Sequence, residues 1–260
     1  MMLACVNDVN CSTPPSTFFF FTLSLDFSMR IKLSLSYIFT FLLLLIVMME
    51  MHELVHISVG RIICECWGPR DFNVWSLCKA CANKSMGWLA TLAGPVFSFT
   101  VMWLGMFWLT SPDAKKKAVG FAFIFTNIPF GRITTMMMGG GDEMVVVRNF
   151  LGNSFSRTQM ILLGSALVLI VALPPIIKAF QVLTNKKSWL YVVGFLTLPL
   201  AFLLLYTLMG LNTLLDKGFL AAPWIMGTPL LITIHTVIAF LLLLWQWKNI
   251  YRFNSGHHGG

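Results

Sequence analysis

The run His52-Glu53-Leu54-Val55-His56 combines two histidines and an acid at a spacing that suits metal-dependent hydrolysis. In a helix, positions i and i+4 lie on one face, so the two imidazoles can bind the same metal ion. A zinc ion held in this way lowers the pKa of a bound water to about 7. Glu53 can take the proton from that zinc-activated water as a general base. The run therefore predicts a zinc site with His52 and His56 as ligands and Glu53 as the catalytic residue.

A third ligand must come from another segment, because a catalytic zinc usually has three protein ligands and one open position. Acidic residues are few, and Asp142 and Glu143 directly follow the run Gly139-Gly140-Gly141. Glycines let the backbone turn tightly and approach closely, and the helix dipole favours an acid at a helix start. We expect Asp142 to be the third ligand, with Glu143 as the alternative. A role for Asp142 as a helix cap alone stays open.

Four cysteines lie in one polar loop just after the histidine run, as Cys64-Glu65-Cys66 and Cys78-Lys79-Ala80-Cys81. Two closely spaced pairs of this kind can hold a second, structural zinc ion. On an oxidising face the same residues would form two disulfides. Four unlinked thiols are the third alternative. In each case the loop lies beside the predicted site, where it can act as a lid or a docking platform.

The elements that position these residues are apolar helices. Hydrophobic residues make up 57% of the 260 residues and charged residues 11%, with a mean hydropathy of +0.80. A soluble domain averages about 45–50% apolar and about 25% charged residues. The composition therefore predicts an integral, multi-pass membrane protein. The formal charge of +8 lies mostly at the ends of apolar segments, which favours contact with the lipid bilayer and not with nucleic acid.

Segments of about 20 apolar residues are long enough to span a bilayer. Five meet this length, namely 33–60, 86–110, 160–180, 189–214 and 222–247, and a shorter sixth runs from 118 to 130 with an extension to 138. The predicted fold is an all-α bundle of about six transmembrane helices, with the cysteine loop after the first. We expect one domain over residues 29–255 and a flexible tail over 256–260. Residues 1–28 are either a segment that precedes a native start at Met29 or an ordinary disordered N-terminal tail.

The order of these motifs resembles the site-2 protease family of intramembrane zinc metalloproteases. It is carried by His52–His56, Ala93-Gly94-Pro95, Asn127-Ile128-Pro129 and the glycine-flanked Asp142. The resemblance covers about residues 33–150. It implies that the two histidines and the later aspartate bind zinc inside the membrane, that Glu53 is the general base, and that transmembrane protein substrates are cut.

The chain departs from the family pattern at four points, the first of which is that Asn127 and Asp142 lie further apart than the corresponding elements of the family. Asn127 and Pro129 are one residue closer than in the family, glycine precedes Asp142 instead of following it, and Ser98 stands near the position of the usual asparagine. Asn127 is a candidate for substrate contact, although it can equally be an amide that packs between helices. Gly140 and Gly141 are candidates to present a backbone edge to an unwound substrate.

The predicted function is hydrolysis of peptide bonds in membrane-embedded or membrane-associated proteins. The alternative from another class is a catalytically inactive relative that acts as a scaffold or as a metal-binding transporter component. A second alternative is a different membrane zinc hydrolase whose third ligand is a glutamate. Because no glutamate follows Glu143, that residue is its only candidate.

Overall fold

The computed structural model describes residues 28–81 and 85–252, and this part of the chain consists of helices and connecting loops without a β-strand. The longer helices are α1 (Leu35–Cys64), α2 (Trp88–Leu109), α3 (Ala114–Thr126), α4 (Pro129–Met137), α5 (Gly141–Leu151), α6 (Arg157–Val182), α7 (Ser188–Phe202) and α9 (Leu230–Gln246). The shorter helical pieces are η1 (Lys79–Cys81), η2 (Gly152–Ser154), the π-helix η3 (Leu203–Asn212), α8 (Thr213–Asp216), η4 (Ile225–Gly227) and α10 (Asn249–Arg252).

Four helices are long and apolar enough to cross a membrane: α1, α2, α6 and the continuous helix Ser188–Asp216 formed by α7, η3 and α8. The other two predicted spans are shorter than expected. The last does not begin at Ala222, because residues before α9 form a loop closed by a bridge between Pro223 and Pro229. Its helix, α9, has 17 residues.

The shorter predicted span, over residues 118–138, is broken into α3 and α4. Ile128 takes a left-handed conformation with φ 51°, and Pro129, which has no backbone N–H, begins α4. A second break follows at Gly139 and Gly141, whose φ values are 75° and 80°. These glycines allow the tight turn that puts Asp142 in the first turn of α5.

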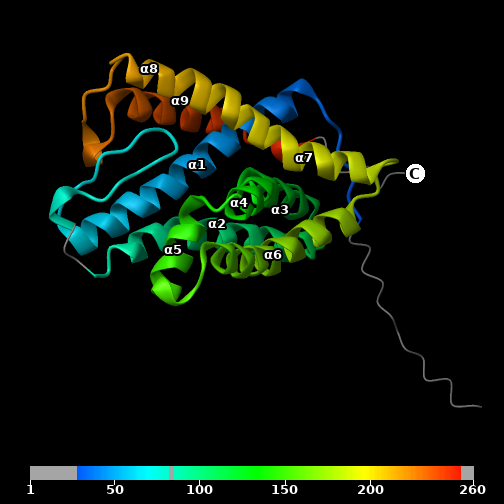
Figure 1. Cartoon of the computed structure of the whole chain (residues 1–260). Coiled ribbons are helices and arrows are strands. Elements are labelled where there is room, and N and C mark those ends of the chain that lie inside the picture. The colour runs from blue at the N-terminus through cyan, green and yellow to red at the C-terminus, as the bar shows by residue number, and fades with distance from the viewer. Residues whose placement is uncertain (1–27, 82–84, 253–260) are drawn as a thin grey trace, which may run out of the picture.

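Helix α1 is the centre of the bundle, with α7, α8 and α9 on one side and α2 to α6 on the other (Figure 1). It begins at Ser34, whose hydroxyl accepts from the backbone N–H of Tyr37. Near this end the rings of Tyr37 and Phe41 meet Phe195 of α7, which also contacts Phe121 of α3. This aromatic core fixes α1 between the two sides.

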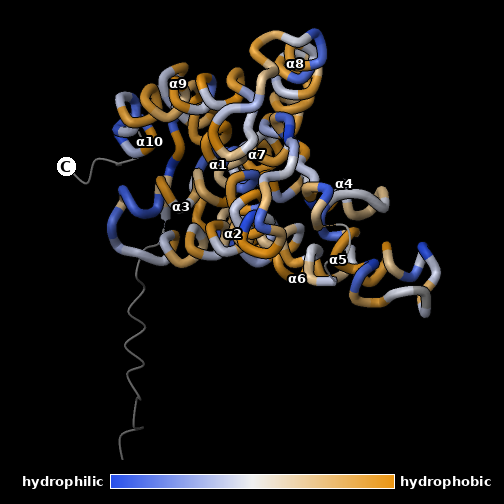
Figure 2. The backbone as a smooth tube through the Cα atoms, turned by 90° about the vertical axis from the view of Figure 1, so that its left-hand side faces the viewer, coloured by the Kyte–Doolittle hydropathy of each residue, from blue (hydrophilic) through white to orange (hydrophobic). Residues whose placement is uncertain are grey.

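The two ends of α1 differ in chemistry. Basic side chains gather at its N-terminal end, where Lys117 lies 3.5 Å from the carbonyl oxygen of Ser28 and Lys115 lies over the ring of Tyr251. Met29, the expected native start, is buried there and pairs with the backbone of Thr184. Residues 1–27 and 256–260 of the predicted tails lie outside the described residues. Along the bundle, hydrophilic residues gather mainly at turns and ends (Figure 2).

The cysteine loop lies at the C-terminal end of α1. Disulfides join Cys64 to Cys81 and Cys66 to Cys78, so the structure selects one of the three states that the sequence left open. Cysteines bonded in this way offer no thiolate to a structural zinc ion. The loop that the Cys66–Cys78 disulfide closes, residues 66–78, folds back along α1 as a hairpin (Figure 1).

Candidate metal centre

Two histidines of α1 and an aspartate of α5 bring three ligand atoms together. The Nε2 atoms of His52 and His56 lie 3.0 Å apart, and Oδ2 of Asp142 lies 3.2 Å from each of them. In a tetrahedral zinc site the ligand atoms lie about 2.0–2.1 Å from the ion, which separates them by about 3.3 Å. The triangle is therefore close to the size that a zinc ion needs for three of its ligands.

The other ring nitrogen of each histidine has a partner that leaves Nε2 free to bind a metal. Nδ1 of His56 lies 2.7 Å from the carbonyl oxygen of Ala90, which can only accept, so this nitrogen carries the proton. Nδ1 of His52 lies 3.0 Å from Oγ of Ser98, which can accept a hydrogen bond, and 2.9 Å from Nη2 of Arg132, which can only donate one. Metal binding through Nε2 requires the tautomer with the proton on Nδ1, for which Ser98 is the acceptor. In these tautomers two nitrogen lone pairs and a carboxylate oxygen meet with no proton between them. A cation stabilises such an arrangement.

The charge of Asp142 is set by its surroundings. Burial raises the pKa of this carboxyl group, but its contacts with His52 and His56 lower the pKa by more. The net pKa lies below the ordinary value for aspartate, so the group is a carboxylate at neutral pH. An ionised oxygen is the form that binds a metal ion.

Gly94 of α2 packs directly against the imidazoles of His52 and His56. A Cβ atom at this position would lie 2.2 Å from Nε2 of His56 and 2.6 Å from Cε1 of His52. Only glycine allows the backbone of α2 to approach the two imidazoles this closely. The Ala93-Gly94-Pro95 motif therefore has a steric reason at its second residue.

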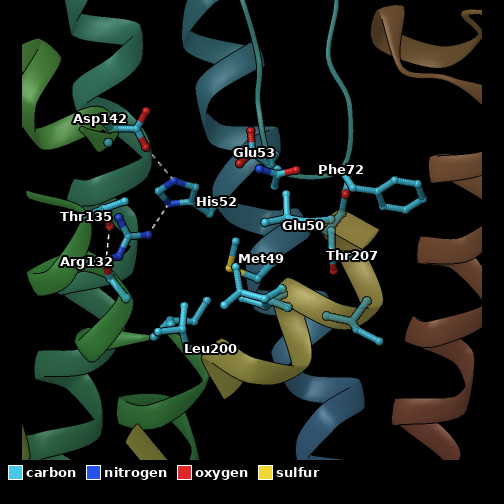
Figure 3. Close-up of a pocket in the computed structure, with 18 of the residues that line it drawn as sticks. Met49, Glu50, His52, Glu53, Phe72, Arg132, Thr135, Asp142, Leu200 and Thr207 are labelled. Carbon is cyan, nitrogen blue, oxygen red and sulfur yellow. Dashed lines mark hydrogen bonds and ion pairs between the residues drawn. The ribbon is translucent and has the colours of Figure 1, made fainter. Parts of the chain in front are cut away.

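Glu53 is buried beside the three ligand atoms, and its Oε2 has no hydrogen-bond partner among the described residues. Together with His52 and Asp142 it lines a cavity of about 510 Å³ (Figure 3). A buried carboxylate oxygen without a partner is costly unless water, a proton or a ligand satisfies it. This placement suits a residue that takes a proton from water.

Arg132 of α4 is a cavity residue that sequence reasoning missed. Its Nη2 lies 2.9 Å from both Nδ1 of His52 and Oγ of Ser98, and its Nη1 donates to Glu143 at 2.9 Å. Figure 3 shows Arg132 and Asp142 reaching His52 from different helices. An ionisable residue within an apolar segment is a functional candidate by default, and this signal was present in the sequence.

A second arginine, Arg70, belongs to the hairpin of residues 66–78. Both of its terminal nitrogens donate to the carboxylate of Glu50, at 2.8 and 2.7 Å, and both side chains are buried. Trp75 of the same hairpin stacks on the His56 ring with a centroid distance of 5.0 Å. The hairpin therefore packs directly against the metal centre, and the loop sequence did not indicate these contacts of Arg70 and Trp75.

The remaining predicted site residues lie at varying distances from the three ligand atoms. Glu143, the alternative third ligand, pairs with Arg132 and not with the histidines. Asn127 is buried at the end of α3, and its Nδ2 donates to the carbonyl oxygen of Phe123. Gly141 lines the cavity, whereas Gly140 and Asn127 are not among its lining residues.

Away from the histidines the cavity is mostly apolar. Its walls come from α1, from the break between α3 and α4, and from the helix α7–η3, through Ile46, Met49, Ile128, Leu200, Leu203 and Leu204. The π-helix η3 also contributes the buried Thr207. The chamber thus joins a polar centre to an apolar space between helices.

Comparisons of the chain with protein-family models, with curated proteins and with solved structures gave no match.

Proposed function

We propose that this protein is a multi-pass membrane zinc metalloprotease of the site-2 protease type, which hydrolyses peptide bonds of membrane-embedded or membrane-associated proteins. The observation that carries the proposal is the meeting of three metal-ligand atoms beside a buried carboxylate with an unpartnered oxygen. A site that only bound metal would have no need of that carboxylate. Glu53 is thus the residue that favours hydrolysis over a scaffold or a transporter component.

Membrane insertion is supported by the outward faces of the long helices. Helix α6 exposes Leu162, Leu167 and Ile170, and α9 exposes Leu241 and Leu244. A continuous apolar surface of this kind is costly in water and stable in lipid. The same lipid would contain the proposed substrates.

The proposed chemistry divides between the metal ligands and Glu53. His52, His56 and Asp142 hold the ion, and zinc supplies a water of lowered pKa together with polarisation of the substrate carbonyl. Glu53 takes one proton from the attacking water, whose oxygen bonds to the carbonyl carbon. The C–N bond then breaks, and the proton held by Glu53 passes to the leaving amine. One water is thereby divided between a carboxylic acid and an amine.

The cavity fits an apolar peptide. Leu200, Leu203 and Leu204 face the same chamber as His52 and Glu53, so apolar side chains next to the scissile bond would be buried there. A helix hides its peptide bonds, and a substrate must therefore be locally unwound before cleavage.

An orientation in the membrane follows from two independent features. Disulfides form in oxidising compartments, and both lie at the C-terminal end of α1, nearer to the histidines. Lys115 and Lys117 lie at the N-terminal end of the same helix, which is about 45 Å long. Because basic loops favour the cytoplasm, both features favour an orientation with the metal centre nearer to the outer face.

The test is zinc content of protein purified in detergent, measured for the wild type and for four variants. His56→Ala and Asp142→Asn are each expected to lose the one equivalent held by the wild type. Asp216→Asn, which changes an exposed acid outside the cavity, is the matched control and keeps its zinc. A fourth variant with all four cysteines replaced by serine also keeps it, because the disulfides leave no zinc site in the hairpin.

Two outcomes would contradict the proposal. Zinc absent from the wild type would remove the metal centre. Zinc that survives Asp142→Asn would place the third ligand elsewhere. Cleavage is then measured on a panel of synthetic transmembrane peptides in the same detergent, with and without a zinc chelator, and only chelator-sensitive cleavage supports a metalloprotease.

A further inference from the structure

We propose that Arg132 is a further catalytic residue, which donates hydrogen bonds to the oxygen of the scissile carbonyl as negative charge develops on it. This inference rests on the proposed function and deepens it. Attack by water moves the π electrons of the carbonyl onto its oxygen, and collapse of the tetrahedral species returns them as the C–N bond breaks. Preorganised donors at that oxygen are typically among the largest contributions to catalysis.

Arg132 stands where such a donor is needed. Its guanidinium lies against the His52 ring, with Nη2 2.9 Å from Nδ1, and it lines the same cavity as Glu53 and Asp142. Among the described residues that line this cavity, Arg132 is the only arginine or lysine. The other charged groups there are carboxylates, which would repel an oxyanion.

The guanidinium is held rigidly. Nη1 donates to Glu143 at 2.9 Å, Nε lies 3.4 Å from the carbonyl oxygen of Asn127, and the group lies over the ring of Phe99 at 5.7 Å. The Arg132 and Glu143 side chains are each 10% exposed. A planar fork fixed on several sides loses little entropy when it binds a substrate oxygen.

Donor groups remain for that oxygen. When Nε2 of His52 binds metal, its Nδ1 carries a proton, so of the two neighbours of Nη2 only Ser98 can accept. A guanidinium has five N–H bonds, and the acceptors at Asn127, Glu143 and Ser98 account for three of them. The second N–H bond of Nη1 is therefore available to a substrate oxygen, whereas the second one of Nη2 lies toward Nδ1 of His52.

The polar side chains that α2, α3 and α4 bring near Arg132 are already committed. Nδ2 of Asn127 donates to the carbonyl oxygen of Phe123, and the hydroxyls of Thr134 and Thr135 both donate to backbone carbonyls of their own helix, α4. Ser98 is used by His52 and Arg132. Of the side chains on these three helices, Arg132 is therefore the cationic donor that can stabilise the oxyanion.

The experiment compares two zinc-directed ligands of the same apolar peptide sequence on the detergent-purified holoprotein. A phosphinic peptide presents a tetrahedral anion, whereas a peptide thiol binds zinc through sulfur and presents no oxyanion. Arg132→Gln is expected to weaken the phosphinic peptide by about 10²–10³-fold, the effect of removing one oxyanion donor. The affinity for the thiol and the zinc content should stay near the wild-type values.

Two further variants complete the design. Arg132→Lys keeps the charge without the fork and is expected to show an intermediate loss for the phosphinic peptide alone. Arg148→Gln removes an exposed arginine of α5 outside the cavity and serves as the matched control, with no change for either ligand. Comparable zinc content and thermal melting across the variants verify that each is folded.

The outcomes separate this inference from the proposed function. Equal weakening of both ligands in Arg132→Gln and Arg132→Lys, or weakening of neither, would overturn the oxyanion role while zinc and thiol binding by the wild type upheld the metal centre. A wild type that held no zinc and bound neither ligand would overturn the proposed function, and this inference with it.

Discussion

Two arginine–glutamate pairs lie on either side of the histidines, and they differ in geometry. Arg70 and Glu50 form two hydrogen bonds of 2.8 and 2.7 Å, and Arg70 adds a third to the carbonyl oxygen of Asp71. Arg132 gives Glu143 a single hydrogen bond and directs the rest of its guanidinium toward Ser98 and His52. Both pairs border the cavity, the first through Glu50 and the second through Arg132 and Glu143, but only the second presents its guanidinium there.

The difference teaches what each pair is for. Arg70 joins the tip of the disulfide-bonded hairpin to the middle of α1, so its pair fixes two parts of the fold. Arg132 lines the cavity and keeps donors for a ligand, so its pair orients a group that acts on substrate. Between the two lies Glu53, the glutamate of the three that has no arginine partner.

The first comparison changes each of the three glutamates to glutamine, and the largest effect on the cleavage rate is expected at Glu53. Glu53→Gln should lower the cleavage rate of a transmembrane peptide by roughly 10²–10⁴-fold, the usual contribution of a general base, with zinc content unchanged. Glu143→Gln should give a smaller loss and keep its zinc. Glu50→Gln should mainly lower stability. Rates and zinc content measured on one preparation of each variant check the series.

This series would break the comparison if Glu53→Gln cut peptides at the wild-type rate, or if Glu143→Gln lost its zinc. The second result would assign the third ligand to Glu143.

A smaller effect, on stability, should separate the two arginines. Arg70→Met leaves Glu50 charged and buried, which is expected to cost about 3–5 kcal/mol. Arg132→Met leaves Glu143 beside a cavity that water can enter, at an expected cost of about 1–3 kcal/mol. The free energies of unfolding are measured by titration with sodium dodecyl sulfate in mixed micelles. Adding Glu50→Leu to Arg70→Met should recover much of the free energy of unfolding that Arg70→Met loses. Failure to recover it would show that the loss does not come from an unpaired charge on Glu50.

The smallest expected effect is on zinc affinity, and it concerns Gly94 of α2, which packs against the two imidazoles. Gly94→Ala puts a Cβ within 2.2 Å of His56 and must displace an imidazole, so zinc affinity should fall by at least about tenfold, as for loss of an outer-shell partner. Gly194→Ala is the matched control, because no atom lies within 4 Å of its added Cβ. Competition with a chelator of known zinc affinity measures both. Equal affinities in the two variants would show that α2 can move away at no cost.

Some of the site was predictable because it depends only on local geometry. His52 and His56 share a face of α1 through the helical repeat, whatever surrounds that helix. The glycines before Asp142 signalled a tight turn, and the structure gives Gly139 and Gly141 positive φ values. The prediction of Asp142 as the third ligand agrees with the observed distances, and its role in zinc binding stays a prediction.

Other expectations failed where local signals compete. The apolar segments 118–138 and 222–247 have the composition of membrane spans, but prolines and a left-handed Ile128 shorten their helices. A window of hydropathy averages over such breaks. It therefore identifies apolar segments more reliably than continuous helices.

The sequence by itself determined the apolar helical character, the spacing of the histidines and the acids available to join them, since these follow from composition and from contacts within one turn. Only the tertiary structure decided which acid meets the histidines and which arginine presents its guanidinium to the cavity. It also decided how the cysteines pair and why Gly94 must lack a side chain. These features join residues 11 to 90 positions apart. Such contacts depend on how whole helices pack, and no local pattern encodes that packing.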